Sequence, residues 1–191
     1  MNGRERIKCA LNRKEPDLVP LCDSVWESTL IRWQNEGFPK NTKATDHSSS
    51  VSDYFNFEYA LIFVDYTPQY SYKIIEETDS YKVTRNRFGE IIKDFIHHDS
   101  TPLTLSSPVK NKQDWEGLKK RYTINNSRLI SIKNVFDNSP DSIVSWEETL
   151  RQAKYDYDKG RFIFFCANVG YDTLQRYLGS EETLMAMITD P

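Results

Sequence analysis

The chain has 191 residues, with 28 acidic and 25 basic side chains and a formal net charge of −3. Hydrophobic residues make up 38% and aromatic residues 13%, which is enough large apolar side chain for a core and too much for a disordered chain. The charges are mixed rather than gathered into a basic surface, and no apolar run reaches the roughly 18 residues of a membrane helix. We therefore expect a globular protein with neither nucleic acid nor membrane among its partners.

Two features of the sequence predict a cytoplasmic protein. The first six residues are charged and are not followed by an apolar stretch, unlike a signal peptide. Cys9, Cys22 and Cys166 are odd in number and lie in apolar contexts, which is typical of reduced core residues and not of a disulfide framework.

The first elements are expected to be a helix, a strand and a second helix. Apolar residues at helical spacing begin the chain, where Asn2 and Glu5 have the spacing of a capping box. The apolar run 18–22 is typical of a buried strand. Ser24 is then expected to cap a helix that ends at Gly37.

A β meander is predicted over about 70–108, because the hydrophobic period changes there to two. Its three expected strands are 73–78, 81–85 and 90–96. The turn pairs Asp79-Ser80 and Phe88-Gly89 would join them.

The second half of the chain is expected to be mainly helical around one apolar strand. The predicted helices are 112–122, 145–159, 171–178 and 181–188, and the strand is 161–167. The strands 18–22 and 161–167 each lead through a loop into a helix, which predicts an α/β fold with a parallel sheet buried on both faces.

Two parts of the sequence resemble the uroporphyrinogen decarboxylase superfamily, which includes the decarboxylase of haem synthesis and the corrinoid- and coenzyme M-dependent methyltransferases. The first part is RERI at 4–7 with ALNRKEPDLVP at 10–20. The second is GYDTLQRYLGSEE at 170–182 with LMAMITDP at 184–191, where a Gly-aromatic loop leads to a short helix and then to an acidic helix before Asp-Pro. The meander and the helix with Asp114-Trp115 are similar to the methyltransferase branch.

This resemblance implies a (β/α)8 TIM barrel, which typically needs about 250 residues. The segment 18–22 would be the first barrel strand and 161–167 the second, with the meander inserted between them. Residues 1–191 are then expected to be the N-terminal part of a single barrel domain, a fragment that is not active alone.

Barrel enzymes place their active-site groups at the carboxyl ends of the strands, and this rule selects four candidate residues. Asp23 is the catalytic candidate, while Trp26, Asn168 and Tyr171 are candidates for substrate binding. Each has a structural alternative. Asp23 can cap the following helix together with Ser24, and Trp26 or Tyr171 can pack into the core.

The reaction that the resemblance favours is methyl transfer involving a corrinoid or a thiol. The decarboxylase branch grips substrate carboxylates with an arginine-rich motif after the first strand, but residues 23–28 read DSVWES and no arginine follows until Arg32. Uroporphyrinogen decarboxylation therefore stays the alternative. A third possibility is a non-catalytic protein that binds partners through the aromatic segment 54–72 and the meander.

The resemblance implies zinc and a corrinoid as cofactors of the complete family member, with a small-molecule substrate and a corrinoid protein as partners. The family's zinc ligands, a His and two Cys, belong to later strands. We expect no cofactor and no metal site in this chain, because Cys22 and Cys166 lack close partner ligands. The histidines at 47 and in His97-His98-Asp99 are expected to face solvent.

Overall fold

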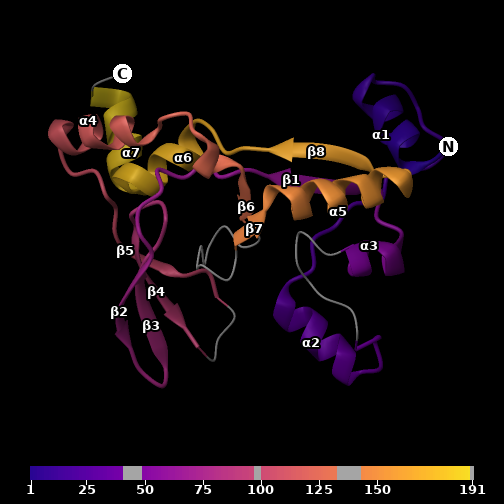
Figure 1. The fold of residues 1–191 in the computed structure, drawn as a ribbon, viewed down its shortest axis with the longest axis horizontal. Helices are drawn as coiled ribbons and strands as arrows, with labels where there is room; N and C mark the ends of the chain where they lie inside the picture. The colour runs from indigo at the N-terminus through magenta and orange to yellow at the C-terminus, as the bar shows by residue number, and fades with distance from the viewer. Residues whose placement is uncertain (41–48, 97–99, 133–142, 190–191) are drawn as a thin grey trace. The chain divides into compact units, whose positions relative to one another are not determined.

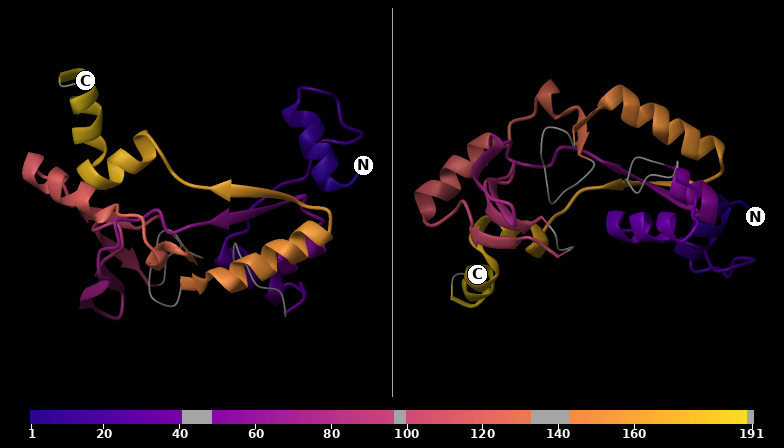
Figure 2. Two further views of the ribbon diagram at one scale, coloured as in Figure 1. Left: turned by 45° about the horizontal axis from the view of Figure 1, so that its top comes forward. Right: turned by 90° about the horizontal axis from the view of Figure 1, so that it is seen from below.

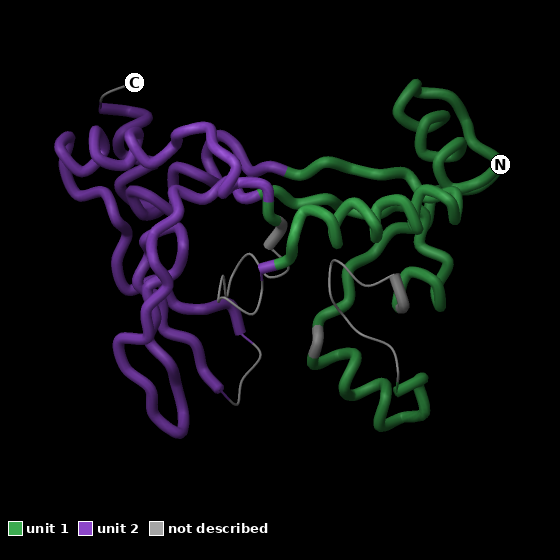
Figure 3. The backbone as a smooth tube through the Cα atoms, viewed as in Figure 1, with its two compact units in different colours: residues 1–64, 130–134, 144–166 green, residues 65–129, 135–143, 167–191 purple. Residues whose placement is uncertain are grey.

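The computed structural model describes residues 1–40, 49–96, 100–132 and 143–189 (Figure 1). Its architecture is mixed α/β, with a two-stranded parallel sheet and a four-stranded antiparallel sheet. The chain divides into two compact units (Figure 3). Unit 1 comprises residues 1–64, 130–134 and 144–166, and unit 2 comprises 65–129, 135–143 and 167–191.

Helices and a parallel strand pair form unit 1. The helices are α1 (Gly3–Leu11), α2 (Glu27–Asn35), α3 (Ser49–Phe55) and α5 (Trp146–Asp158). The parallel pair is β1 (Tyr59–Phe63) with β8 (Phe162–Cys166). Two short strands, β6 (Ile130–Ile132) and β7 (Ile143–Ser145), form a separate sheet.

The parallel pair is the part of the structure that fits the predicted α/β fold. Its register places Tyr59 opposite Phe162 and Phe63 opposite Cys166. Parallel strands need a long crossover connection, and here that connection ends in α5, which packs against both strands. The helix runs alongside the pair in every view (Figures 1 and 2).

The prediction of a strand at 18–22 is wrong. This segment forms no strand, and its side chains are largely exposed, with Val19 89% accessible. Pro20 has no N–H group to give to a ladder. Beside β1, the backbone of this segment accepts a hydrogen bond at Leu21 O from Glu58 N, at 2.9 Å. The strand beside β8 is instead β1, which lies within the aromatic segment.

The starts of the first two helices differ in how well the sequence predicts them. Asn2 and Glu5 form the expected capping box of α1. Ser24 does not cap α2, because the N-cap residue is Trp26 and no side chain caps that end. Gly37 follows α2 with a φ of +108°, a conformation that glycine adopts without strain, as the sequence predicts.

The core of unit 1 joins α2 and α3. Leu30, Val51 and Phe57 are buried in it, with Phe38 and Phe55 packed against them. The rings of Phe55 lie 5.5 Å from Phe57 and 5.7 Å from Phe38, both stacked. This cluster buries the aromatic side chains that precede β1.

A buried arginine holds the start of β8. Arg161 is only 6% exposed and donates to Asp156 Oδ1 and to Asp53 Oδ1, both at 2.6 Å. Its Nε donates to the carbonyl of Phe57 at 2.9 Å. The side chain thereby connects α3, the segment before β1, and α5.

Unit 2 contains the predicted meander, with one strand more than expected. The strands β2 (Lys73–Glu77), β3 (Tyr81–Arg85), β4 (Ile91–Phe95) and β5 (Leu103–Ser106) are antiparallel in chain order. The turn predicted at Phe88-Gly89 joins β3 to β4. Gly89 has a φ of +89°, and a Cβ there would lie 2.7 Å from the Tyr70 ring, so glycine is required.

The helices of unit 2 pack with the meander around one aromatic core. They are α4 (Lys112–Arg121), α6 (Tyr171–Leu178) and α7 (Ser180–Thr189), and a 3-10 turn covers Asn126–Arg128. Phe88, Val109, Leu118 and Tyr177 are buried together. These helices, α5 and β8 confirm the predicted elements within one or two residues, while residues 47 and 97–99 lie outside the described part of the chain.

We expect Arg161→Met to lower the free energy of unfolding by about 3 kcal/mol, because it leaves the buried carboxylate of Asp156 without its cation. Urea unfolding followed by circular dichroism measures the change. Arg151→Met is the matched control, since Arg151 is 74% exposed and its pair with Glu148 lies on the surface of α5. A loss of stability that is equal in the two variants would contradict a special role for Arg161.

Candidate functional site

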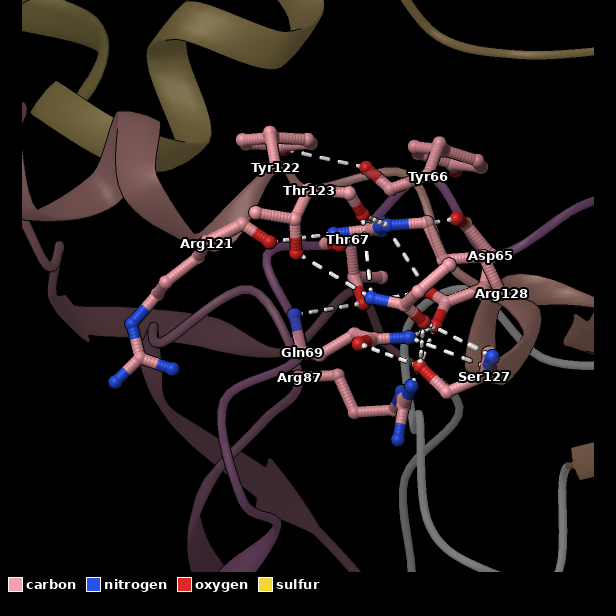
Figure 4. Close-up of polar contacts among 11 residues, drawn as sticks. Asp65, Tyr66, Thr67, Gln69, Arg87, Arg121, Tyr122, Thr123, Ser127 and Arg128 are labelled. Atoms are coloured by element: carbon pink, nitrogen blue, oxygen red, sulfur yellow. Dashed lines mark hydrogen bonds and ion pairs between the residues drawn. The ribbon is translucent and has the colours of Figure 1, made fainter.

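A buried carboxylate lies just after the end of β1. Asp65 is the second residue beyond that strand, and its side chain is 0% exposed. Oδ1 accepts hydrogen bonds from the Thr67 backbone N at 3.0 Å and from Thr67 Oγ1 at 2.6 Å. Oδ2 accepts from Gln69 Nε2 at 2.7 Å and from Arg87 Nη2 at 2.6 Å (Figure 4). Both carboxylate oxygens are therefore saturated with donors.

These donors keep Asp65 ionised. Burial by itself raises the pKa of Asp65, but hydrogen bonds from Thr67 and Gln69 and the positive charge of Arg87 outweigh it. The pKa consequently lies below the ordinary value of the carboxyl group. An ionised, fully bonded carboxylate is suited to orienting its neighbours rather than to taking up a proton.

Arg128 organises the backbone around this carboxylate. Its Nη1 donates to the carbonyl oxygens of Thr67 at 2.7 Å and Asp65 at 3.3 Å. Nη2 donates to Arg121 O at 2.6 Å, and Nε donates to Thr123 O at 2.8 Å (Figure 4). One guanidinium thus ties the segment after α4 to the segment after β1.

Arg87 is the cationic group of the cluster with donor capacity left. It is 16% exposed, and its Nη2 is held by Asp65. Its Nε is buried and has no hydrogen-bond partner among the described residues. Guanidinium groups bind carboxylate, phosphate and sulfonate oxygens through paired N–H donors. Asp65 therefore positions Arg87, and Arg87 can bind an anionic group.

Two tyrosines close the cluster on the side of the aromatic core. The hydroxyls of Tyr122 and Tyr177 are hydrogen-bonded to each other, and Tyr122 also donates to the carbonyl of Tyr66 at 3.2 Å. Burial raises the pKa of both phenols above the ordinary value. They remain neutral hydrogen-bonding groups that fix the segment carrying Asp65.

The four residues predicted as site residues lie apart from this cluster in the chain. Asp23 and Trp26 belong to unit 1, and Asn168 and Tyr171 belong to unit 2. Asp23 and Asn168 are exposed, as are Trp26 (60%) and Tyr171 (37%). Within the described residues, no hydrogen bond or ring contact links Asp23 with Trp26 or Asn168 with Tyr171.

The structural alternatives for Asp23 and Trp26 are not confirmed. The Asp23 carboxylate accepts from Ser24 N at 2.7 Å instead of capping α2, and its carbonyl accepts from Tyr59 Oη at 3.2 Å. Trp26 is too exposed to be a core residue. The rule that selected both residues also no longer applies, because no strand precedes them. Their role in binding or catalysis stays a prediction.

The described residues do not fit a zinc site. Cys9, Cys22 and Cys166 are free thiols, and Cys22 is exposed instead of lying in the core as predicted. Over the described ranges, no group of three His, Cys, Asp or Glu side chains is placed to hold a metal ion. The same part of the chain has no helix that is both long and apolar enough to cross a membrane.

Comparisons of the chain with protein-family models, with curated proteins and with solved structures find no match.

The sequence reasoning missed Asp65 and Arg87. Asp65 directly follows the apolar run 59–64, so the rule that selected Asp23 would have selected Asp65 had this run been taken as a strand. No local sequence pattern predicts that Arg87 contacts Asp65, since the two residues are 22 positions apart in the chain.

We expect Asp65→Asn to lower the free energy of unfolding at neutral pH by about 2 kcal/mol, because Arg87 loses its countercharge. The free energy of unfolding of the variant should also depend less on pH than that of the wild type. Because folding lowers the pKa of Asp65, the ionised carboxylate stabilises the folded chain at pH values above the ordinary carboxyl pKa of 3.8. This stabilisation is lost as the pH falls through the pKa of the folded state. Urea unfolding between about pH 7 and pH 3 measures both effects.

Asp172→Asn is the control for this experiment, since Asp172 is exposed on the first turn of α6. It should change stability by less than about 0.5 kcal/mol at any of these pH values. A wild-type pH dependence that persists unchanged in Asp65→Asn would refute the assignment of the ionised state to this carboxylate.

Proposed function

We propose that this chain forms the N-terminal part of a (β/α)8 barrel enzyme of the uroporphyrinogen decarboxylase superfamily, related to the corrinoid- and thiol-dependent methyltransferases. The observation that carries the proposal is the parallel pairing of β1 with β8, with α5 packed against both strands. This is the βα repeat from which such barrels are built. The likenesses at 4–20 and 170–191 support the same assignment.

The parallel pair also supports a need for further strands. In the described chain, β1 forms a ladder with β8 alone, so each strand has one edge beside which no further described strand lies. A barrel would remove both edges by adding strands. We therefore propose that activity requires these additional βα units and that the chain alone binds substrate without turning it over.

The Asp65–Arg87 pair is the part of the substrate site that this chain would supply. Asp65 follows the parallel strand β1, and the ends of such strands are where barrel enzymes carry binding and catalytic groups. Arg87 would hold an anionic group of a small substrate, and Asp65 would orient the guanidinium. Zinc and a corrinoid would supply thiol activation and the methyl group in the complete enzyme, with a corrinoid protein as partner. A cytoplasmic location belongs to the same proposal.

The alternative function is decarboxylation of a porphyrinogen, a substrate with many carboxylates. The hydrogen bonds that the arginines already make within the chain argue against it. Such a substrate needs several available guanidinium groups. Arg128 is committed to backbone carbonyls, and Arg161 is committed to buried carboxylates. Arg32, the first arginine after the expected motif position, is exposed and pairs with Glu36. Arg87 by itself suits a substrate with one anionic group.

A non-catalytic interaction protein is the second alternative, and one observation favours it. Large apolar side chains are exposed on both outer strands of the meander and on α7. They include Ile74, Ile75, Leu103, Leu105, Leu184 and Ile188. Such surfaces mark interaction sites, but further barrel elements would cover apolar surface as well.

The proposed function predicts that the chain binds a small thiol with an anionic tail through Arg87. We expect 2-mercaptoethanesulfonate to bind in ligand-observed NMR and Arg87→Lys to weaken this binding about tenfold, because an ammonium cannot reproduce the guanidinium geometry. Arg121→Lys is the control, since Arg121 stacks 3.9 Å from the Tyr70 ring and is exposed.

Three outcomes would count against this proposal. Equal binding by wild type and Arg87→Lys would remove Arg87 from the site. Tighter binding of coproporphyrin than of the thiol, followed by its absorbance, would favour the decarboxylase. Binding of neither compound would favour a non-catalytic role.

A further inference from the structure

A second polar site lies within unit 2, and none of its lining residues belongs to the Asp65 cluster. A pocket of about 220 Å³ is lined by the β3–β4 turn, the region of β5 and the junction of α6 with α7. Seven of its lining residues are polar, namely Asn86, Glu90, Thr101, Thr104, Gln175, Arg176 and Ser180. The proposed function does not use any of them.

The floor of this pocket contains a buried carboxylate with one open oxygen. Glu90 has a side chain that is only 8% exposed. Its Oε2 accepts from Asn86 Nδ2 at 2.8 Å and from Arg176 Nη1 at 3.3 Å. Oε1 accepts no hydrogen bond from any described residue. Oε1 is not among the buried unpartnered atoms of the described residues, so it is accessible and can accept from a ligand with an N–H or O–H group.

Next to Glu90, the pocket is lined by a positively charged group and an amide donor. The guanidinium of Arg176 lies 4.4 Å from the Phe88 ring, which together with Glu90 fixes the position of its positive charge. Gln175 Oε1 accepts from Ser180 Oγ at 3.3 Å, while its Nε2 donates to no described residue. An amide donor and a cation therefore lie next to the open carboxylate oxygen.

We propose that this pocket binds a small zwitterion that carries an ammonium and a carboxylate group, such as a free α-amino acid with a short side chain. The ammonium would donate to Glu90 Oε1, and the carboxylate would face Gln175 Nε2 and the charge of Arg176. Among the described lining residues, one carboxylate is matched by one guanidinium, which favours a zwitterion over a simple cation or anion.

The size of the pocket supports this class of ligand. Sites for drug-sized molecules occupy about 300–1,000 Å³, so 220 Å³ suits a smaller compound. The hydroxyls of Thr101 and Thr104 lie at the exposed rim, where a short side chain of the ligand would emerge.

The test is isothermal titration calorimetry of the whole chain with glycine, alanine and serine, against methylammonium, acetate and glycerol at matched ionic strength. We expect saturable binding of the amino acids with a dissociation constant of about 1 mM or below and at least about tenfold weaker binding of the other three compounds. Glu90→Gln keeps the size of the side chain but removes its charge, and it should weaken amino-acid binding about tenfold.

A second variant keeps the proposal testable if Glu90→Gln does not fold. Thr104→Phe fills the pocket from the exposed rim and should abolish binding without changing the melting temperature. Leu105→Phe is its control, because Leu105 is an exposed neighbour on the same strand that does not line the pocket.

The proposal is overturned if no amino acid binds, or if Thr104→Phe binds as well as wild type. Glycerol binding as tightly as serine would make this a polyol site and would also overturn it. Because Arg87→Lys leaves the pocket lining unchanged, failure of the thiol to bind through Arg87 is distinguishable from failure here.

Discussion

The need to compensate buried charge is the constraint on which both units depend. An ion in the protein interior loses its hydration, so it persists there only with opposite charge and complete hydrogen bonding. In unit 1 this applies to Arg161, which pairs with two carboxylates and one carbonyl. In unit 2 it applies to Asp65, whose four donors come from Thr67, Gln69 and Arg87. Each of these groups fixes the chain next to a strand of the parallel pair.

The same constraint separates structural arginines from one that is available for function. Arg128 and Arg161 use their donors on groups of the chain itself, so they cannot serve a ligand without losing the local fold. Arg87 has a buried Nε that no described residue accepts from. The proposed substrate site follows from this difference in hydrogen-bond satisfaction and not from the number of arginines present.

The pocket of unit 2 presents polar atoms that have no partner among the described residues. The open oxygen of Glu90 and the amide of Gln175 point to a ligand of mixed polarity. The meander therefore carries two different kinds of polar group. One, Arg87, is held by the segment after β1, and the other, Glu90, is held by α6. Both residues lie in the turn that joins β3 to β4, so this one turn contributes to both proposed sites.

The sequence by itself determined the local elements of this protein. Capping residues, glycines and hydrophobic periods specify α1, the meander and the helices α4 to α7, because these signals act over a few neighbouring residues. Tertiary structure decided which apolar run pairs with β8. The runs 18–22 and 59–63 are equally apolar, but only the second is free of proline and able to form the ladder. It also decided the candidate site, since Asp65 and Arg87 are far apart in the chain and meet only because burying the carboxylate requires a cation beside it.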